Sequence, residues 1–172
     1  MTRRSRTPTT LAPQGQLSRG GARILDATEH DPYHRPGHYA EPSHCEACGA
    51  VLQHGRWSWH TAQPGSHATV CPACARVRDH LPAGRVTLSG AYANAHRDEL
   101  LKIARHQAEL ERREHALNRI MRIDEQADGV EISTTDVHLP RRIGTALKRA
   151  HDGELKIDFA GDEYGVRVHW QR

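Results

Sequence analysis

The four cysteines of this 172-residue chain are the residues whose type and spacing most clearly indicate chemistry. They form two Cys-x-x-Cys pairs, Cys45 with Cys48 and Cys71 with Cys74, and residues 49–70 separate the pairs. Zn²⁺ prefers four soft ligands in a tetrahedron, and two such pairs supply four thiolates without help. We therefore predict one zinc ion bound by all four cysteines. Because four protein ligands leave no position for water or substrate, this zinc should be structural.

The same cysteines have other uses that the sequence leaves open. A single Cys-x-x-Cys pair can carry redox chemistry, and in an oxidising compartment paired cysteines form disulfides. His44 and His60 lie near the pairs and could replace a thiolate ligand. Two pairs at this spacing favour the zinc site, and Gly49 suits a tight turn after the first pair. We predict a zinc ribbon that the metal stabilises, since so small a unit has little core.

Two tryptophans and an arginine stand between the cysteine pairs, at Arg56, Trp57 and Trp59. In a strand, residues two apart point to the same face, so both indoles should lie together. One interpretation is an RNA contact, in which the indoles stack on bases or ribose and Arg56 faces a phosphate. The other is packing, either as a cap on the metal unit or against a second domain. Packing is the favoured interpretation because a small zinc unit has few core residues.

A second candidate surface lies on the helix expected over residues 136–151. Successive helical residues are 100° apart, and this places five basic side chains in one stripe: His138, Arg141, Arg142, Lys148 and Arg149. Apolar residues occupy the opposite side: Leu139, Ile143, Ala146, Leu147 and Ala150. A basic stripe of this kind suits an RNA phosphate backbone or an acidic protein, although a merely solvated face has the same pattern.

Three regions should position these residues. Residues 1–30 are expected to be a disordered basic tail, since arginine outnumbers the acidic residues there by five to two and the net charge of the whole chain is +3. Residues 31–84 should form the zinc ribbon, preceded by an extended proline-rich arm. Residues 85–172 alternate between strand and helix patterns and should form an α+β domain.

The α+β domain is expected to follow the order β-α-β-β-α-β-β. The pattern predicts strands over 85–90, 119–124, 130–133, 155–159 and 166–171, and helices over 92–115 and 136–151. A turn at Ala127-Asp128-Gly129 should join two of the strands. Thr134, Thr135 or Asp136 is available as the N-cap of the second helix, and Pro140 suits its first turn. This order is close to a ferredoxin-like split βαβ unit with an added final strand.

Several function classes have no support in the sequence. The apolar stretches are too short to span a bilayer, and the first residues lack the apolar middle of a signal peptide, so a cytoplasmic protein without membrane contact is expected. No phosphate-binding GxxxxGK[ST] loop, GxSxG elbow or HExxH motif is present. We therefore expect a binding protein and not an enzyme.

The combined motifs resemble those of a family of small bacterial zinc-ribbon proteins. The resemblance covers roughly residues 31–172, and the motifs that carry it are Asp31–Tyr33, Cys45–Gly49, Gly55–Trp59, Cys71–Cys74 and Thr134–Leu147. That family is in turn similar to the zinc-bearing adaptor of the nonsense-mediated-decay type that accompanies the large ribosomal subunit in archaea and eukaryotes.

The resemblance implies a function in ribosome stability or messenger-RNA decay. Our leading expectation is a non-enzymatic, zinc-stabilised module that associates with the ribosome or with structured RNA. The alternative is a stress-response adaptor in which the same surfaces bind an acidic protein. The sequence does not indicate an oligomeric state.

Overall fold

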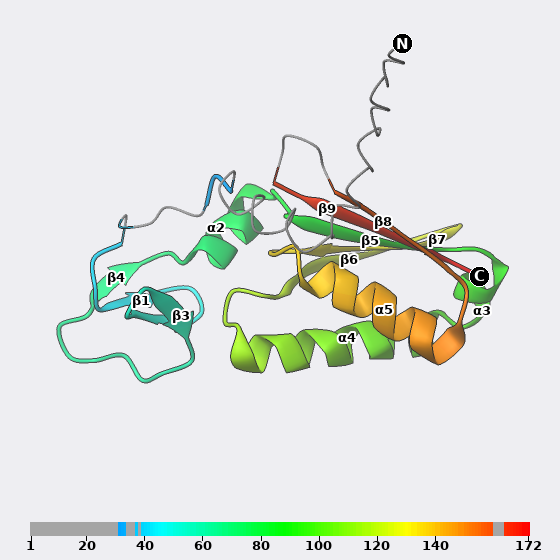
Figure 1. Cartoon of the computed structure of the whole chain (residues 1–172). Helices are drawn as coiled ribbons and strands as arrows, with labels where there is room; N and C mark the ends of the chain where they lie inside the picture. The colour runs from blue at the N-terminus through cyan, green and yellow to red at the C-terminus, as the bar shows by residue number, and fades with distance from the viewer. Residues whose placement is uncertain (1–30, 34–36, 38, 160–163) are drawn as a thin grey trace, which may run out of the picture.

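The computed structural model describes residues 31–33, 37, 39–159 and 164–172, so the expected basic tail over 1–30 lies outside the described residues. The described residues form a mixed α+β structure with two sheets and four helices (Figure 1). None of these helices has both the length and the apolar character that crossing a bilayer demands.

The first sheet is built from four strands of three residues each: β1 (Ser43–Cys45), β2 (Val51–Gln53), β3 (Arg56–Ser58) and β4 (His67–Thr69). Their order is β3-β2-β1-β4, with β1 parallel to β4 and the other pairs antiparallel. Helix α2 (Pro72–Asp79) follows directly. A small core of Cys45, Ala50, Leu52, Trp57, Cys71 and Ala73 lies within this unit.

The second cysteine pair lies at the start of a helix, which we did not expect in the predicted zinc ribbon. Cys71 is the N-cap residue of α2, Pro72 occupies the first helical position, and Cys74 lies in the first turn. Proline is favoured at this position because its fixed φ suits a helix and its missing N–H has no helical partner. The metal unit is therefore a strand-and-turn segment joined to a helix, whereas the sequence analysis predicted no helix here.

The second sheet contains five longer strands: β5 (Gly84–Ser89), β6 (Ile120–Gln126), β7 (Gly129–Thr134), β8 (Glu154–Phe159) and β9 (Val166–Gln171). Their order is β6-β7-β5-β9-β8. As in a split βαβ unit, β7 lies antiparallel between β5 and β6. The added strand β9 lies inside the sheet, parallel to β5 and antiparallel to β8, so the second half of the sheet departs from the ferredoxin-like order that we expected.

Three helices accompany this sheet: α3 (Ala91–Ala95), α4 (Arg97–Glu114) and α5 (Leu139–His151). Helices α4 and α5 lie side by side over one face (Figure 1). The alternation predicted for the last strand is observed, because Val166, Val168 and Trp170 are buried towards the helices. Helix α5 approaches closely at Gly144, where an added Cβ would lie 2.6 Å from a methyl carbon of Val168.

The first long helix differs from the prediction in two details. The span expected over 92–115 is divided at His96 into α3 and α4. Leu110 is 40% exposed although it is apolar, and the neighbouring Glu111 is instead buried. Glu111 continues the helical spacing of buried Leu100 and Ala104, so position along the helix, and not polarity, decides which side chain faces inward.

Helix α5 begins at Leu139, three residues after the start of the expected span, with His138 as its N-cap residue and Pro140 in its first turn. One carboxylate oxygen of Asp136 accepts the backbone N–H groups of His138 and Leu139 at 2.7 and 2.8 Å, so Asp136 satisfies two of the unpaired donors at this helix start. Burial raises the pKa of the Asp136 carboxyl to about 6, against the opposing effect of those two N–H groups. The second carboxylate oxygen is buried without a hydrogen-bond partner among the described residues.

Candidate metal centre and basic groove

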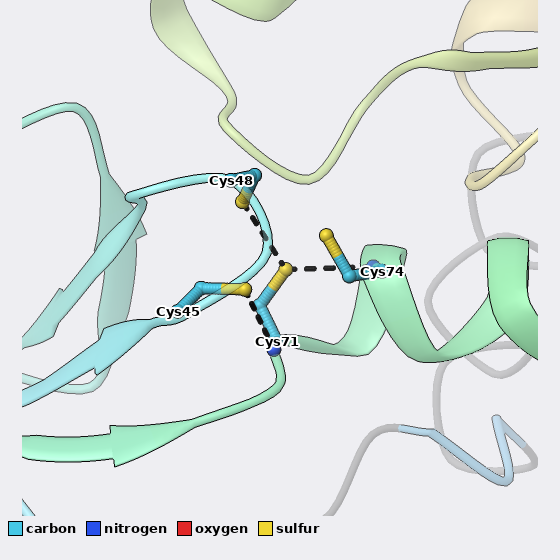
Figure 2. Close-up of side chains that lie close together, drawn as sticks. All are labelled: Cys45, Cys48, Cys71 and Cys74. Carbon is cyan, nitrogen blue, oxygen red and sulfur yellow. Dashed lines mark hydrogen bonds between the residues drawn. The ribbon is translucent and has the colours of Figure 1, made fainter.

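The four cysteine sulfurs converge on one point between β1 and α2 (Figure 2). All four Sγ atoms lie within 4.8 Å of one another, and those of Cys48 and Cys71 are 3.7 Å apart. Ligands at about 2.3 Å from a central zinc would be about 3.8 Å from one another in a regular tetrahedron. The cysteines are free thiols, with no disulfide among them. The prediction that these four residues form one metal site is confirmed.

The first pair is shaped by the turn that follows β1. The Cys45 N–H donates to the carbonyl of Ala50 at 2.7 Å, and the Gly49 N–H donates to the carbonyl of Cys45 at 2.8 Å. This turn requires a φ of +77° at Gly49, which a residue with a side chain rarely adopts. Glycine therefore allows the chain to reverse closely enough to aim Cys45 and Cys48 at the same point.

Backbone N–H groups also approach the sulfurs directly. The Cys71 N–H donates to Sγ of Cys45 at 3.3 Å, and the Cys74 N–H at the start of α2 donates to Sγ of Cys71 at 3.4 Å. Burial disfavours the Cys45 thiolate, but N–H donors, that of Cys71 foremost, outweigh burial and lower its pKa to about 7. For Cys71, burial and the neighbouring cysteines raise the pKa of the thiol. A metal cation supplies the positive charge that such a crowded set of thiolates needs.

Arg119 is a further member of this centre that the sequence analysis missed. Its Nη2 lies 3.5 Å from Sγ of Cys71 and 3.5 Å from Sγ of Cys74. Burial opposes the charge of this guanidinium, but the hydrogen bond to Cys74 and the nearby thiols raise its pKa above the usual value. Arg119 precedes β6, 45 residues after Cys74, so no local spacing indicated this contact.

The two nearby histidines are not part of the sulfur cluster. Nδ1 of His44 lies 2.8 Å from the hydroxyl of Ser66, and Nδ1 of His60 lies 2.6 Å from the hydroxyl of Ser58. Each ring is thus engaged by a serine of the same unit. Among the described residues, the cluster that could hold a metal ion consists of the four cysteines alone.

The residues Arg56, Trp57 and Trp59 join the metal unit to the end of α4. Trp57 is 8% exposed and belongs to the small core. The indole N–H of Trp59 donates to the carbonyl of Arg112, whose guanidinium lies 5.1 Å from the indole centroid. Arg56 donates to the carbonyl of Glu114 at 3.1 Å. These contacts support the packing interpretation for all three residues, and the buried indole of Trp57 is not available for base stacking.

The basic stripe of α5 lies beside further basic residues from α4. A groove of about 1050 Å³ runs between the two helices, and we call it the α4–α5 groove. Six basic side chains line it: Lys102, His106, His138, Arg141, Arg142 and Arg149. No acidic residue is among the described residues that line it. Lys148, the remaining residue of the predicted stripe, is exposed but lies outside the groove lining.

The basic residues of the α4–α5 groove are not equally free to meet a ligand. The guanidinium of Arg142 pairs with the carboxylate of Glu111, which is buried beneath the groove. Within the described part of the chain, Lys102, Arg141 and Arg149 form no ion pair. Burial, followed by the charge of Arg141, lowers the pKa of His138, so its ring is neutral at pH 7.

Comparison with protein-family models, with curated proteins and with solved structures finds no match for this chain.

Proposed function

We propose that Cys45, Cys48, Cys71 and Cys74 hold one structural Zn²⁺ ion. Four thiolates at tetrahedral spacing are the ligand set that zinc prefers in structural sites, and they fill its coordination shell. When bound, the ion supplies a cross-link between the turn after β1 and the start of α2. Arg119 would offset part of the negative charge that remains on four thiolates and one divalent ion.

We further propose that the zinc-stabilised protein acts by binding RNA through the α4–α5 groove. The single observation that carries this proposal is the gathering of basic side chains from both helices on one surface without an acidic lining residue, with Lys102, Arg141 and Arg149 free of ion pairs among the described residues. Phosphate backbones are bound by such surfaces, and Lys and Arg supply most of the affinity. The resemblance to ribosome-associated zinc proteins would make ribosomal RNA the source of these phosphates.

The contacts of each groove residue decide which of them should be substituted to test RNA binding. Arg142 is unsuitable because its loss would leave the buried carboxylate of Glu111 without its cation, and the variant would then be destabilised. Arg141→Glu with Arg149→Glu removes two unpaired cations and leaves that pair intact. We expect co-sedimentation of the full chain with ribosomes to fall at least about tenfold at moderate salt.

A matched control removes two cations from the opposite face of the second sheet. Arg167 and Lys156 are exposed residues of β9 and β8, on the face that carries no helix. Arg167→Glu with Lys156→Glu makes the same change in net charge. Equal loss in both double variants would show an effect of net charge alone, and unaltered co-sedimentation of the groove variant would remove the groove from the proposal.

A further inference from the structure

We infer that the α4–α5 groove binds double-stranded RNA by its backbone and does not read a base sequence. This inference rests on the proposed RNA-binding function and specifies its ligand. It depends on the kinds of side chain that line the groove, on where the aromatic residues of the chain lie, and on the length of the basic row on α5.

The aromatic residues of this chain are engaged elsewhere. Proteins that read single-stranded RNA splay its bases onto aromatic side chains, chiefly Phe, Tyr and Trp. No Phe, Tyr or Trp is among the described residues that line the groove. Trp57 and Trp170 are buried in the two cores, and Trp59 packs against Arg112. The groove therefore offers charges and hydrogen bonds, but no large stacking platform.

The side chains that do line the groove suit the outside of a duplex. Double-stranded RNA is recognised mostly through its phosphates and its 2′-hydroxyl groups. The unpaired cations Lys102, Arg141 and Arg149 can meet phosphates. Gln107 and Thr145 are neutral groups that can both donate and accept hydrogen bonds, and they lie in the same lining. Such neutral groups are what a 2′-hydroxyl requires.

The dimensions of the groove fit a rigid backbone. From Arg141 to Arg149, the two unpaired cations of α5, the distance along the helix is about 12 Å, at about 1.5 Å per residue. Helix α4 forms the opposite wall, about 8 to 10 Å away between helix axes. Because fixed helices hold the cations at fixed spacing, a backbone of regular geometry meets them at a lower entropic cost than a flexible strand.

Fluorescence anisotropy with the zinc-loaded full chain tests this inference. The probes are two 20-base-pair RNA duplexes of unrelated sequence, one of their single strands, and a DNA duplex of matched sequence. We expect the two RNA duplexes to bind within about threefold of each other. We expect the RNA single strand and the DNA duplex each to bind at least about tenfold more weakly. The affinity for duplex RNA should fall with salt with a log–log slope of about −3 for three phosphate contacts.

Two variants locate the binding. Arg141→Gln with Arg149→Gln should reduce the salt slope by about 2, whereas Arg167→Gln with Lys156→Gln should leave it unchanged. Far-UV circular dichroism checks that each variant is folded. If the groove variant fails to fold, Lys102→Gln, which changes a single exposed side chain, should still reduce the slope by about 1.

The possible outcomes separate the inference from the proposed function. Tighter binding to the single strand, a tenfold difference between the two RNA duplexes, or equal binding of DNA and RNA duplexes overturns the inference while RNA binding stands. Binding to none of the probes, together with nuclease-resistant complexes that contain an acidic protein, overturns both.

Discussion

The metal unit and the five-stranded unit are held together by different means. The first has strands of three residues and a core that includes two of its own cysteines. The second has strands of six or seven residues and a continuous apolar core that includes Leu88, Leu100, Ile132, Leu147 and Trp170. This difference predicts that apolar burial sustains the second unit alone, whereas the first depends on the proposed metal cross-link. The predictions below test this contrast, beginning with the largest effect.

Loss of a ligand should unfold the metal unit and leave the five-stranded unit in place. Structural zinc in small domains contributes about 10–16 kcal/mol of apparent binding free energy at pH 7, which is folding free energy for such a unit. In Cys71→Ser we expect loss of stoichiometric zinc and loss of hydrogen-exchange protection in β1–β4 and α2. Amides of β5, β7 and β9 should stay protected. His44→Ala is the matched control, and protection in β1–β4 that survives a strong chelator would contradict the contrast.

Shortening a buried apolar side chain should destabilise the five-stranded unit and leave the metal unit intact. Leu147 in α5 is fully buried, so Leu147→Ala should lower the free energy of unfolding of the five-stranded unit by about 2–5 kcal/mol. Urea titration followed by circular dichroism measures this change. Zinc content at low urea should be unaltered, and release of zinc by this variant under native conditions would show that the two units do not differ in the way described.

The buried carboxyl of Asp136 should make the second unit sensitive to pH. Its pKa is about 6 in the folded chain and 3.8 for the free side chain, so folding favours the protonated form. The stabilisation is fully present below about pH 4 and is lost as pH rises through about 6, by up to about 3 kcal/mol. Asp136→Asn retains an oxygen for the N–H groups of His138 and Leu139 but does not titrate. We expect the wild-type chain to lose stability relative to this variant between pH 4 and 7.

Urea titrations of the two proteins across this pH range measure the difference. Zinc release at acid pH affects both proteins alike, so the difference isolates Asp136. If the free energies of unfolding of wild type and Asp136→Asn change with pH in parallel, the Asp136 carboxyl does not contribute to the pH dependence of stability.

The smallest expected effect concerns the contact between the two units at the metal centre. Removing a residue that hydrogen-bonds to metal ligands typically lowers metal affinity about 10- to 100-fold. Arg119→Gln should weaken zinc binding in this range, as measured by competition with a chromophoric chelator. Arg122→Gln, on an exposed residue of β6 three positions away, should leave the affinity unchanged. Equal zinc affinities in the two variants would show that Arg119 does not contribute to zinc binding.

Local patterns predicted those parts of the molecule that local interactions determine. The spacing of Cys45, Cys48, Cys71 and Cys74 gave the metal site, since ligand geometry is set within each pair. The alternation along β9 followed from the twofold period of a strand, and the hairpin between β6 and β7 lies where it was predicted. Its turn residues are Ala127 and Asp128, however, and Gly129 is already the first residue of β7 without a positive φ, so the predicted Asp-Gly turn is not observed. Pro140 lies in the first turn of α5 as predicted, although the N-cap residue is His138 and not one of the three residues that we expected.

Contacts between segments that are far apart in the chain could not be predicted from the sequence. Arg119 reaches the sulfurs because the segment before β6 packs on the metal unit, and no spacing along the chain encodes that packing. The position of β9 between β5 and β8 depends on which strand pairing buries most apolar surface, which strand patterns alone do not decide. The α4–α5 groove also required both helices, since Lys102 and His106 lie on α4 and the other basic lining residues lie on α5 or at its N-cap.

The central position of β9 constrains the order in which the protein can fold. Gly84 in β5 pairs with Val166 in β9, so the two middle strands of the second sheet meet only across a separation of about eighty residues. During synthesis, the segment that carries the cysteines emerges before the five-stranded unit, so the proposed zinc ion would bind before that unit folds. The five-stranded unit must wait until Gln171 has left the exit tunnel, so α4 and α5 are made long before the sheet beneath them can close.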